Sequence, residues 1–177
     1  PLHDIAGQHP LFGKAPELGD LEGLNKRDGV VVDRVEHLQA AGHEVAILNR
    51  GGSAAPDGVE QLVADRKDSA AMARALRGRQ WDAVYDVSAS AQVASVDDIA
   101  TLIDELDGRC GVYLFVSSIA AYRMGHGSLP WSEELPTTRS RPGKYGGHKA
   151  AAEQLLAARR ARNGFAYTVL RPAAVYG

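Results

Sequence analysis

A tyrosine and a lysine lie four residues apart in the sequence, at Tyr145 and Lys149. Residues with this spacing share one face of an α-helix. A lysine ammonium about 4 Å from a phenolate stabilises it by roughly 4 kcal/mol at an effective dielectric near 20, an upper figure that solvent screening reduces. The pair could therefore make the phenol a usable acid or base at neutral pH. By itself the spacing is more often found on an ordinary surface helix.

The elements around this pair give it a setting in which such chemistry is useful. The segment 111–116 is typical of a buried strand, and it ends on two serines. An alanine-rich helix then carries Tyr145 and Lys149, and the segment 166–172 is typical of the next strand. A serine hydroxyl at the end of one strand could hydrogen-bond the same substrate oxygen that the tyrosine protonates or deprotonates.

The rest of the chain alternates between predicted strands and helices. Further strands are expected at 43–50, 59–64 and 81–87, and helices at 69–76 and 96–106. Strands separated by single helices predict right-handed crossovers and a parallel sheet, which is the doubly wound α/β class (Rossmann-like). Ligands bind such sheets at the carboxyl ends of the strands. The loop 123–143 must cross that edge and could cover a substrate.

The N-terminal part is less regular. Residues 1–28 show no sustained period and are expected to be mostly loop, so we place the Rossmann-like domain at 29–177. Three consecutive valines from Val30 would suit a short strand, whereas the spacing of Val31, Val35 and Leu38 favours a helix that stops at Gly42. We favour the helix.

From about Gly42 to Gly177 the sequence resembles the extended short-chain dehydrogenase/reductase family, which includes the NAD(P)-dependent epimerases and dehydratases. The resemblance rests on a strand-end serine, Tyr145 and Lys149 on one helix, and a strand that closes on Arg-Pro-x-x-Val-Tyr-Gly at 171–177. It implies that Ser118 is the catalytic serine, with Ser117 the less favoured choice. It also implies that Tyr145 is the acid-base, and that Lys149 both lowers the proton affinity of the phenol and binds the nicotinamide ribose.

The resemblance also implies where a dinucleotide would bind. The expected contacts, in addition to Lys149, are Asn49, Arg50, Asp65, Arg66, Val87, Ser88, Pro172 and Val175. At the end of the second family strand, an acidic residue would accept the ribose hydroxyls of NAD, whereas a guanidinium suits the 2′-phosphate of NADP. Because this chain has Arg50 and no acid there, NADP is the expected cofactor and NAD the alternative.

The sequence departs from the family at its N-terminal end. Relatives carry a Gly-x-x-Gly-x-x-Gly turn that admits the diphosphate, and its last two glycines should fall at Asp28 and Val31. The segment could be divergent, altered relative to a normal parent, or unnecessary for binding. Relatives also continue past Val-Tyr-Gly to build the substrate pocket, so we expect either the cofactor-domain portion of a larger enzyme or a reduced member of the family.

Composition narrows the classes of function. The formal net charge of −2 and the lack of a basic face interleaved with aromatic residues disfavour nucleic acid as a partner. No apolar run reaches the roughly 18 residues of a membrane span, and the six histidines lack metal spacing, so we expect neither a membrane protein nor a metal site. The single cysteine, Cys110, suggests a reduced thiol and a cytoplasmic protein.

These observations lead to two hypotheses. In the first, the protein is an NAD(P)-dependent oxidoreductase or epimerase/dehydratase that acts on a small molecule with a hydroxyl or carbonyl group, with a nucleotide sugar as one candidate. In the second, it is a non-catalytic Rossmann-like protein that regulates or binds a partner. The helix 96–106 and the helix that carries Tyr145 could also pair with the same helices of a second copy of the chain, which would form a homodimer.

Overall fold

The computed structural model describes residues 29–87, 94–123, 131–138 and 144–173, with side chains from Val35 onward. The chain divides into two compact units, Pro1–Glu44 and Val45–Gly177. In the first unit, helix α1 (Gly29–Ala40) confirms the helix that the valine spacing favours. The helix ends in a tight turn, in which Gly42 has a φ of 84° and the N–H of His43 donates to the carbonyl of Leu38 at 3.0 Å.

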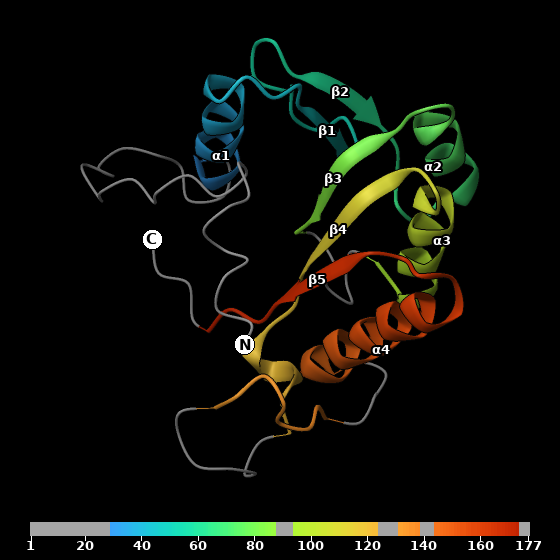
Figure 1. The fold of residues 1–177 in the computed structure, drawn as a ribbon. Coiled ribbons are helices and arrows are strands. Elements are labelled where there is room, and N and C mark those ends of the chain that lie inside the picture. The colour runs from blue at the N-terminus through green and yellow to red at the C-terminus, as the bar shows by residue number, and fades with distance from the viewer. Residues whose placement is uncertain (1–28, 88–93, 124–130, 139–143, 174–177) are drawn as a thin grey trace. The chain divides into compact units, whose positions relative to one another are not determined.

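The second unit holds two parallel sheets (Figure 1). Strands β1 (Ala46–Asn49) and β2 (Glu60–Val63) pair with each other. Strands β3 (Trp81–Asp86), β4 (Cys110–Val116) and β5 (Tyr167–Leu170) form the second sheet in the order β3–β4–β5. All the pairings are parallel, so the carboxyl ends of the strands within each sheet lie at one edge.

Helices alternate with these strands as the sequence pattern predicts. They are α2 (Ser69–Leu76), α3 (Val96–Leu106), the short 3₁₀ helix η1 (Ile119–Ala121) and α4 (Tyr145–Asn163). Local signals fix their ends: Asp68 caps α2, Ser95 and Asp98 form a capping box on α3, and Gly164 ends α4 in a left-handed conformation. Short-range interactions therefore set the beginnings of α2 and α3 and the end of α4.

The apolar faces of helices and strands meet in one core. Its most deeply buried side chains include Met72, Ile99, Ile103, Leu106, Tyr113, Phe115 and Leu156. They come from α2, α3, β4 and α4, so burial of apolar surface holds the helix that carries Tyr145 to the strand that leads to Ser118.

The topology confirms the doubly wound α/β class. A dinucleotide-binding sheet has the strand order 3-2-1-4-5-6, with its first strand in the middle. Sheet β1–β2 corresponds to one side of this order and sheet β3–β4–β5 to the other, while within the described residues no strand pairs with both β1 and β3.

Four strand predictions were too long at their ends, one of them, 81–87, by a single residue, since β3 ends at Asp86. Residues 43–45 were expected to open the first strand, but His43 is bonded to the end of α1 and β1 begins at Ala46. Strand β2 spans 60–63 rather than 59–64, and β5 spans 167–170 rather than 166–172. Pro172 has no N–H to donate to a neighbouring strand, which accounts for part of the shortening of β5. No helix in the described part of the chain is both long and apolar enough to cross a membrane.

Candidate active site

The serine turn follows directly from the end of β4. Ser118 caps the 3₁₀ helix η1, and its hydroxyl oxygen accepts a hydrogen bond from the N–H of Ala120 at 3.1 Å. The carbonyl of Pro172, just past β5, accepts from the N–H of Ile119 at 3.1 Å. The turn is therefore anchored to the neighbouring strand at the carboxyl edge of the sheet.

The two serines have different surroundings. Ser117 is buried, and its hydroxyl donates to the carboxylate of Glu153 on α4. Ser118 is half-buried, and the one hydrogen bond of its side chain within the described residues is the one it accepts from Ala120. The Ser118 hydroxyl can thus still donate its proton to a substrate oxygen, whereas that of Ser117 is already committed.

Tyr145 and Lys149 lie one turn apart at the beginning of α4. The Tyr145 side chain is 49% exposed, while Lys149 is only 3% exposed. The Lys149 ammonium donates to the carbonyl of Val116 at 2.6 Å and lies 5.8 Å from the centre of the Tyr145 ring. Lys149 therefore links the end of β4, immediately before the serines, to the tyrosine.

The charge of Lys149 is set by opposing effects. Burial lowers the pKa of its ammonium, and the nearby charge of Arg66 lowers it further, whereas the carboxylates of Asp86 and Glu153 raise it. The net result is a pKa below the ordinary value for lysine. Such an ammonium gives up its proton more readily than a lysine on the surface.

A glycine allows the serine turn and the tyrosine helix to meet. A Cβ on Gly146 would lie 2.8 Å from the carbonyl carbon of Ala120 in η1, and closer still to its oxygen. Real side chains do not approach a backbone so closely. Gly146 was missed in the sequence, although two glycines at the start of a helix are costly for helix formation and were a signal.

The predicted cofactor residues on the first sheet have mixed surroundings. The amide oxygen of Asn49 accepts from the N–H of Gly51 at 2.8 Å and from the side chain of Gln61 at 2.9 Å. Asn49 therefore shapes the turn that follows β1. Arg50 is exposed beside that turn, where its guanidinium is accessible to an anionic ligand.

Asp65 and Arg66 do not pair with each other. Asp65 is exposed and accepts from the N–H of Lys67 at 3.0 Å. Arg66 is 9% exposed, and its two terminal nitrogens donate to the carboxylate of Asp86 at 2.6 and 2.7 Å. Tyr113 also donates to Asp86. This buried cluster joins the carboxyl end of β2 to that of β3, and Asp86 was missed as a partner because it lies 20 residues further along the chain.

The remaining predicted contacts are placed only in part. Val87 is exposed just past β3, and Pro172 is half-buried beside the serine turn. Ser88 and Val175 lie outside the described residues. The structure thus brings Ser118, Tyr145, Lys149 and Pro172 to one region.

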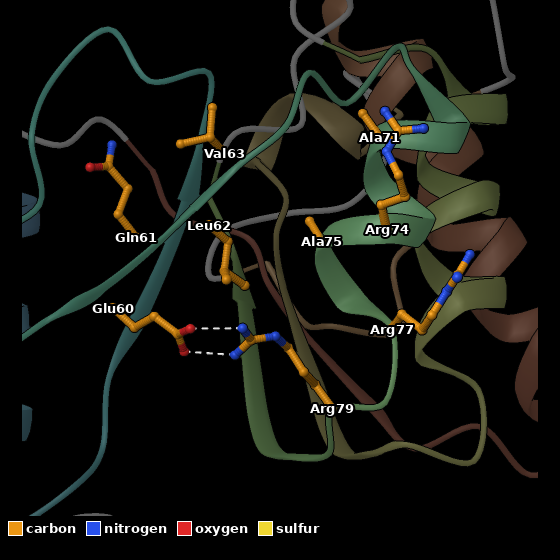
Figure 2. Close-up of a pocket in the computed structure, with 9 residues that line it drawn as sticks. All are labelled: Glu60, Gln61, Leu62, Val63, Ala71, Arg74, Ala75, Arg77 and Arg79. Atoms are coloured by element: carbon orange, nitrogen blue, oxygen red, sulfur yellow. Dashed lines mark hydrogen bonds and ion pairs between the residues drawn. The ribbon is translucent and has the colours of Figure 1, made fainter.

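A cavity of about 430 Å³ lies elsewhere, beside β2 and α2 (Figure 2). It is lined by Glu60, Gln61, Leu62, Val63, Ala71, Arg74, Ala75, Arg77 and Arg79. Arg79 points across it to Glu60, with two hydrogen bonds of 2.6 and 2.7 Å. None of the predicted site residues lines this cavity, so its size alone does not make it the site of chemistry.

The residues present fit the two ends of a dinucleotide better than its middle. The Lys149 ammonium has three N–H donors, which suits both the Val116 carbonyl and ribose hydroxyls, and Arg50 offers an exposed guanidinium for a phosphate. An aspartate at position 28, in contrast, would repel the diphosphate. Position 28 lies outside the described residues, as do the side chains of 29–34.

Comparisons with solved structures show the same fold. A UDP-glucose 4-epimerase from Thermus thermophilus in complex with NAD is 24% identical, with a TM-score of 0.58 over 77% of this chain and 49% of that one. A UDP-glucose 4-epimerase from Thermotoga maritima with UDP-glucose is 21% identical, with a TM-score of 0.65 over 81% and 52%. A mutated uronate dehydrogenase is 19% identical, with a TM-score of 0.65 over 81% and 54%.

The chain spans about half the length of these solved structures. Among curated proteins, none matches it at a significant level. A family model, described as the NAD dependent epimerase/dehydratase family, matches residues 34–177. That range includes the serine turn, Tyr145 and Lys149, and it covers most of the chain. The chain therefore belongs to the NAD dependent epimerase/dehydratase family.

Proposed function

We propose that this protein forms the cofactor-side part of an NAD(P)-dependent oxidoreductase or epimerase/dehydratase that acts on a hydroxyl or carbonyl group of a small molecule. The main support is the packing of the Ser118 turn against the first turn of α4, with the Lys149 ammonium bonded to the last residue of β4. This packing brings a hydroxyl, a phenol and an ammonium to the carboxyl edge of a parallel sheet, which is where such sheets bind ligands.

The three side chains would divide the chemistry between them. A bound nicotinamide supplies or accepts the hydride. Ser118 would hydrogen-bond the reacting oxygen of the substrate and fix its position, because its proton can still be donated. Tyr145 is exposed enough to reach that oxygen and would give it a proton or take one from it. Lys149 would hold positive charge behind the phenol and direct its other N–H groups toward the ribose.

The choice of cofactor follows from Arg50. Its exposed guanidinium, with no acidic residue at the end of β1, favours NADP over NAD. A nucleotide sugar is our first candidate for the substrate, because UDP-glucose 4-epimerases are among the similar structures. The predicted cytoplasmic location and homodimer stay predictions.

Titration of the chain with NADPH and NADH, followed by nicotinamide fluorescence, tests the proposal. We expect NADPH to bind more tightly, and Arg50→Ala to weaken NADPH binding by about tenfold or more, the value of one charge-assisted hydrogen bond, while NADH binding changes little. Arg77→Ala is a matched control, because Arg77 is an exposed arginine that lines the cavity beside α2. Failure of both nucleotides to bind at millimolar concentration would end the proposal for this chain.

A non-catalytic role is the second candidate, and the aspartate and valine in place of the family glycines favour it. Turnover of a candidate nucleotide sugar, compared between the wild type and Tyr145→Phe, separates the two roles. An enzyme should turn the sugar over and lose at least a hundredfold in kcat when only the hydroxyl is removed. A regulatory protein should show no turnover in either form.

A further inference from the structure

A second, partly buried ion pair joins the helix that carries Lys149 to Arg171, just past β5. Glu153 is one turn further along α4 and is 8% exposed. Its carboxylate accepts from Nε of Arg171 at 3.0 Å and from Nη2 at 2.6 Å, and it also accepts from the hydroxyl of Ser117. Hydrogen bonding to Glu153 raises the pKa of Arg171 against the opposing effect of burial. Arg171 therefore carries its positive charge in the folded protein.

The other side of the Arg171 guanidinium meets the residues that follow the serine turn. Its Nη1 donates to the carbonyl of Glu133 at 3.2 Å, and its central carbon lies 4.5 Å from the centre of the Tyr122 ring. The Tyr122 ring in turn packs edge-on against Trp131, with ring centres 5.6 Å apart. One guanidinium thus contacts α4, the end of the turn and the segment 131–138.

Backbone hydrogen bonds fasten that segment to the turn as well. The N–H of Arg123 donates to the carbonyl of Pro136 at 2.9 Å, and the N–H of Thr138 donates to the carbonyl of Ala121 at 2.7 Å. Tyr122 and Thr137 form an antiparallel bridge between these two bonds. The segment 131–138 is therefore hydrogen-bonded to the end of the turn that begins at Ser118.

We propose that Glu153 and Arg171 are positioning residues that hold the Ser118 turn and the segment 131–138 in place beside Tyr145. Ser117 precedes Ser118 and bonds to Glu153, while Tyr122 ends the turn and stacks on Arg171. The ion pair therefore fixes both ends of the turn to α4, which also carries Tyr145. The inference rests on the proposed function for the roles of Ser118 and Tyr145, but the mechanical link does not depend on it.

The geometry requires an arginine rather than a lysine. A guanidinium is a planar fork that can bind a carboxylate through two nitrogens, donate a third bond sideways and stack on a ring at the same time. An ammonium at position 171 could keep the charge next to Glu153 but could not keep the stack on Tyr122 and the bond to Glu133 together. Arg171→Lys therefore tests the link to the turn without leaving Glu153 as an uncompensated buried charge.

Amide hydrogen exchange of the chain, read by NMR, provides the test. In Arg171→Lys we expect the amides of Arg123 and Thr138 to exchange at least tenfold faster, because the loss of one hydrogen bond made by a charged group corresponds to a factor of about ten or more. The exchange of the Phe115 amide in β4 should accelerate much less. Arg79→Lys is the matched control, because Arg79 also binds a glutamate through two nitrogens and lies over an aromatic ring, Trp81, at 6.0 Å. The control should leave the Arg123 and Thr138 amides unchanged.

Unchanged exchange at Arg123 and Thr138 would overturn the proposal, and so would an equal acceleration at Phe115, which would mean that the ion pair serves only global stability. If Arg171→Lys does not fold, the double variant Glu153→Leu with Arg171→Leu replaces the pair by apolar groups, which cores commonly tolerate. It should show the same local acceleration, and wild-type protection in it would equally refute the link.

The exchange experiment needs neither cofactor nor substrate, so it stands whether or not a dinucleotide binds. Where turnover is measurable, Arg171→Lys should lower kcat by tenfold or more with a smaller change in KM, because Ser118 would act mainly on the transition state. A change confined to KM would contradict a positioning role toward Ser118.

Discussion

Replacing Gly146 by alanine tests the contact on which the candidate site depends. The added Cβ would lie 2.8 Å from the carbonyl carbon of Ala120 and nearer to its oxygen. Because carbon atoms pack best at about 3.5 to 4 Å, helix α4 and the serine turn would have to move apart by about 1 Å. The atoms in the way belong to the backbone, so no side chain can rotate to relieve the overlap.

Two effects of opposite sign determine the change in stability. Alanine favours a helix over glycine by about 1 kcal/mol. Overpacking against a rigid neighbour costs about 1 to 3 kcal/mol, and a backbone neighbour places this case near the upper end. We therefore expect Gly146→Ala to lower the free energy of unfolding by about 1 to 2 kcal/mol. A displacement of about 1 Å at the site should also lower turnover by about a hundredfold.

Urea unfolding followed by circular dichroism measures the stability change. Gly52→Ala is the control, since a Cβ there would meet no atom within 4 Å, and it should change the free energy of unfolding by less than about 0.5 kcal/mol. If Gly146→Ala instead raises the free energy of unfolding by about 1 kcal/mol, the value of helix propensity alone, α4 and the serine turn are not in close contact.

Two further predictions concern buried charges. Asp86→Asn removes the counter-charge of the buried Arg66 and should lower the free energy of unfolding, measured in urea, by about 3 to 5 kcal/mol. Asp104→Asn, in the more exposed pair with Arg159, should lower it by less than about 1 kcal/mol. Similar losses in the two variants would contradict the buried cluster. Burial, together with the charge of Lys149, lowers the pKa of His148 below its usual 6.5, so the unfolded state binds the proton more readily and stability should fall as the pH drops below about 6.5. His148→Gln should lose this part of the pH dependence between pH 7 and 5, and an unchanged slope of unfolding midpoint against pH would refute it.

Local patterns predicted the helices better than the strands. The bounds of helix 96–106 are confirmed residue for residue, because Ser95 and Asp98 supply a capping box at its start and Leu106 is the last residue of its buried face. The strand expected at 43–50 shows the limit of such patterns. His43 and Glu44 directly precede the apolar run 45–48, yet the hydrogen bond from His43 to Leu38 assigns His43 to the end of a helix.

The residue types of the candidate site could be predicted, but the contacts that hold it together could not. Ser118, Tyr145 and Lys149 follow from motif and spacing. Pairing of Glu153 with Ser117, 36 residues away, depends on how α4 crosses β4, and no local pattern contains that information. The same holds for Arg66 and Asp86, where a strand-end arginine expected to contact a dinucleotide instead bonds to a carboxylate on another sheet.

The ion pairs Arg66–Asp86 and Arg171–Glu153 also influence the charge of the buried Lys149. Burial alone would drive Lys149 toward its neutral form, which could neither hold a phenolate nor donate three hydrogen bonds. Asp86 and Glu153 each favour the ammonium, and each carboxylate is itself held by an arginine, Arg66 or Arg171. Arg66 lowers the pKa of Lys149 while Asp86 raises it, so that pKa depends on how these groups are arranged rather than on their number. The side chains that hold the turns at the edge of the sheet therefore also influence the pKa of Lys149, so the same contacts determine both the geometry and the electrostatics beside Tyr145.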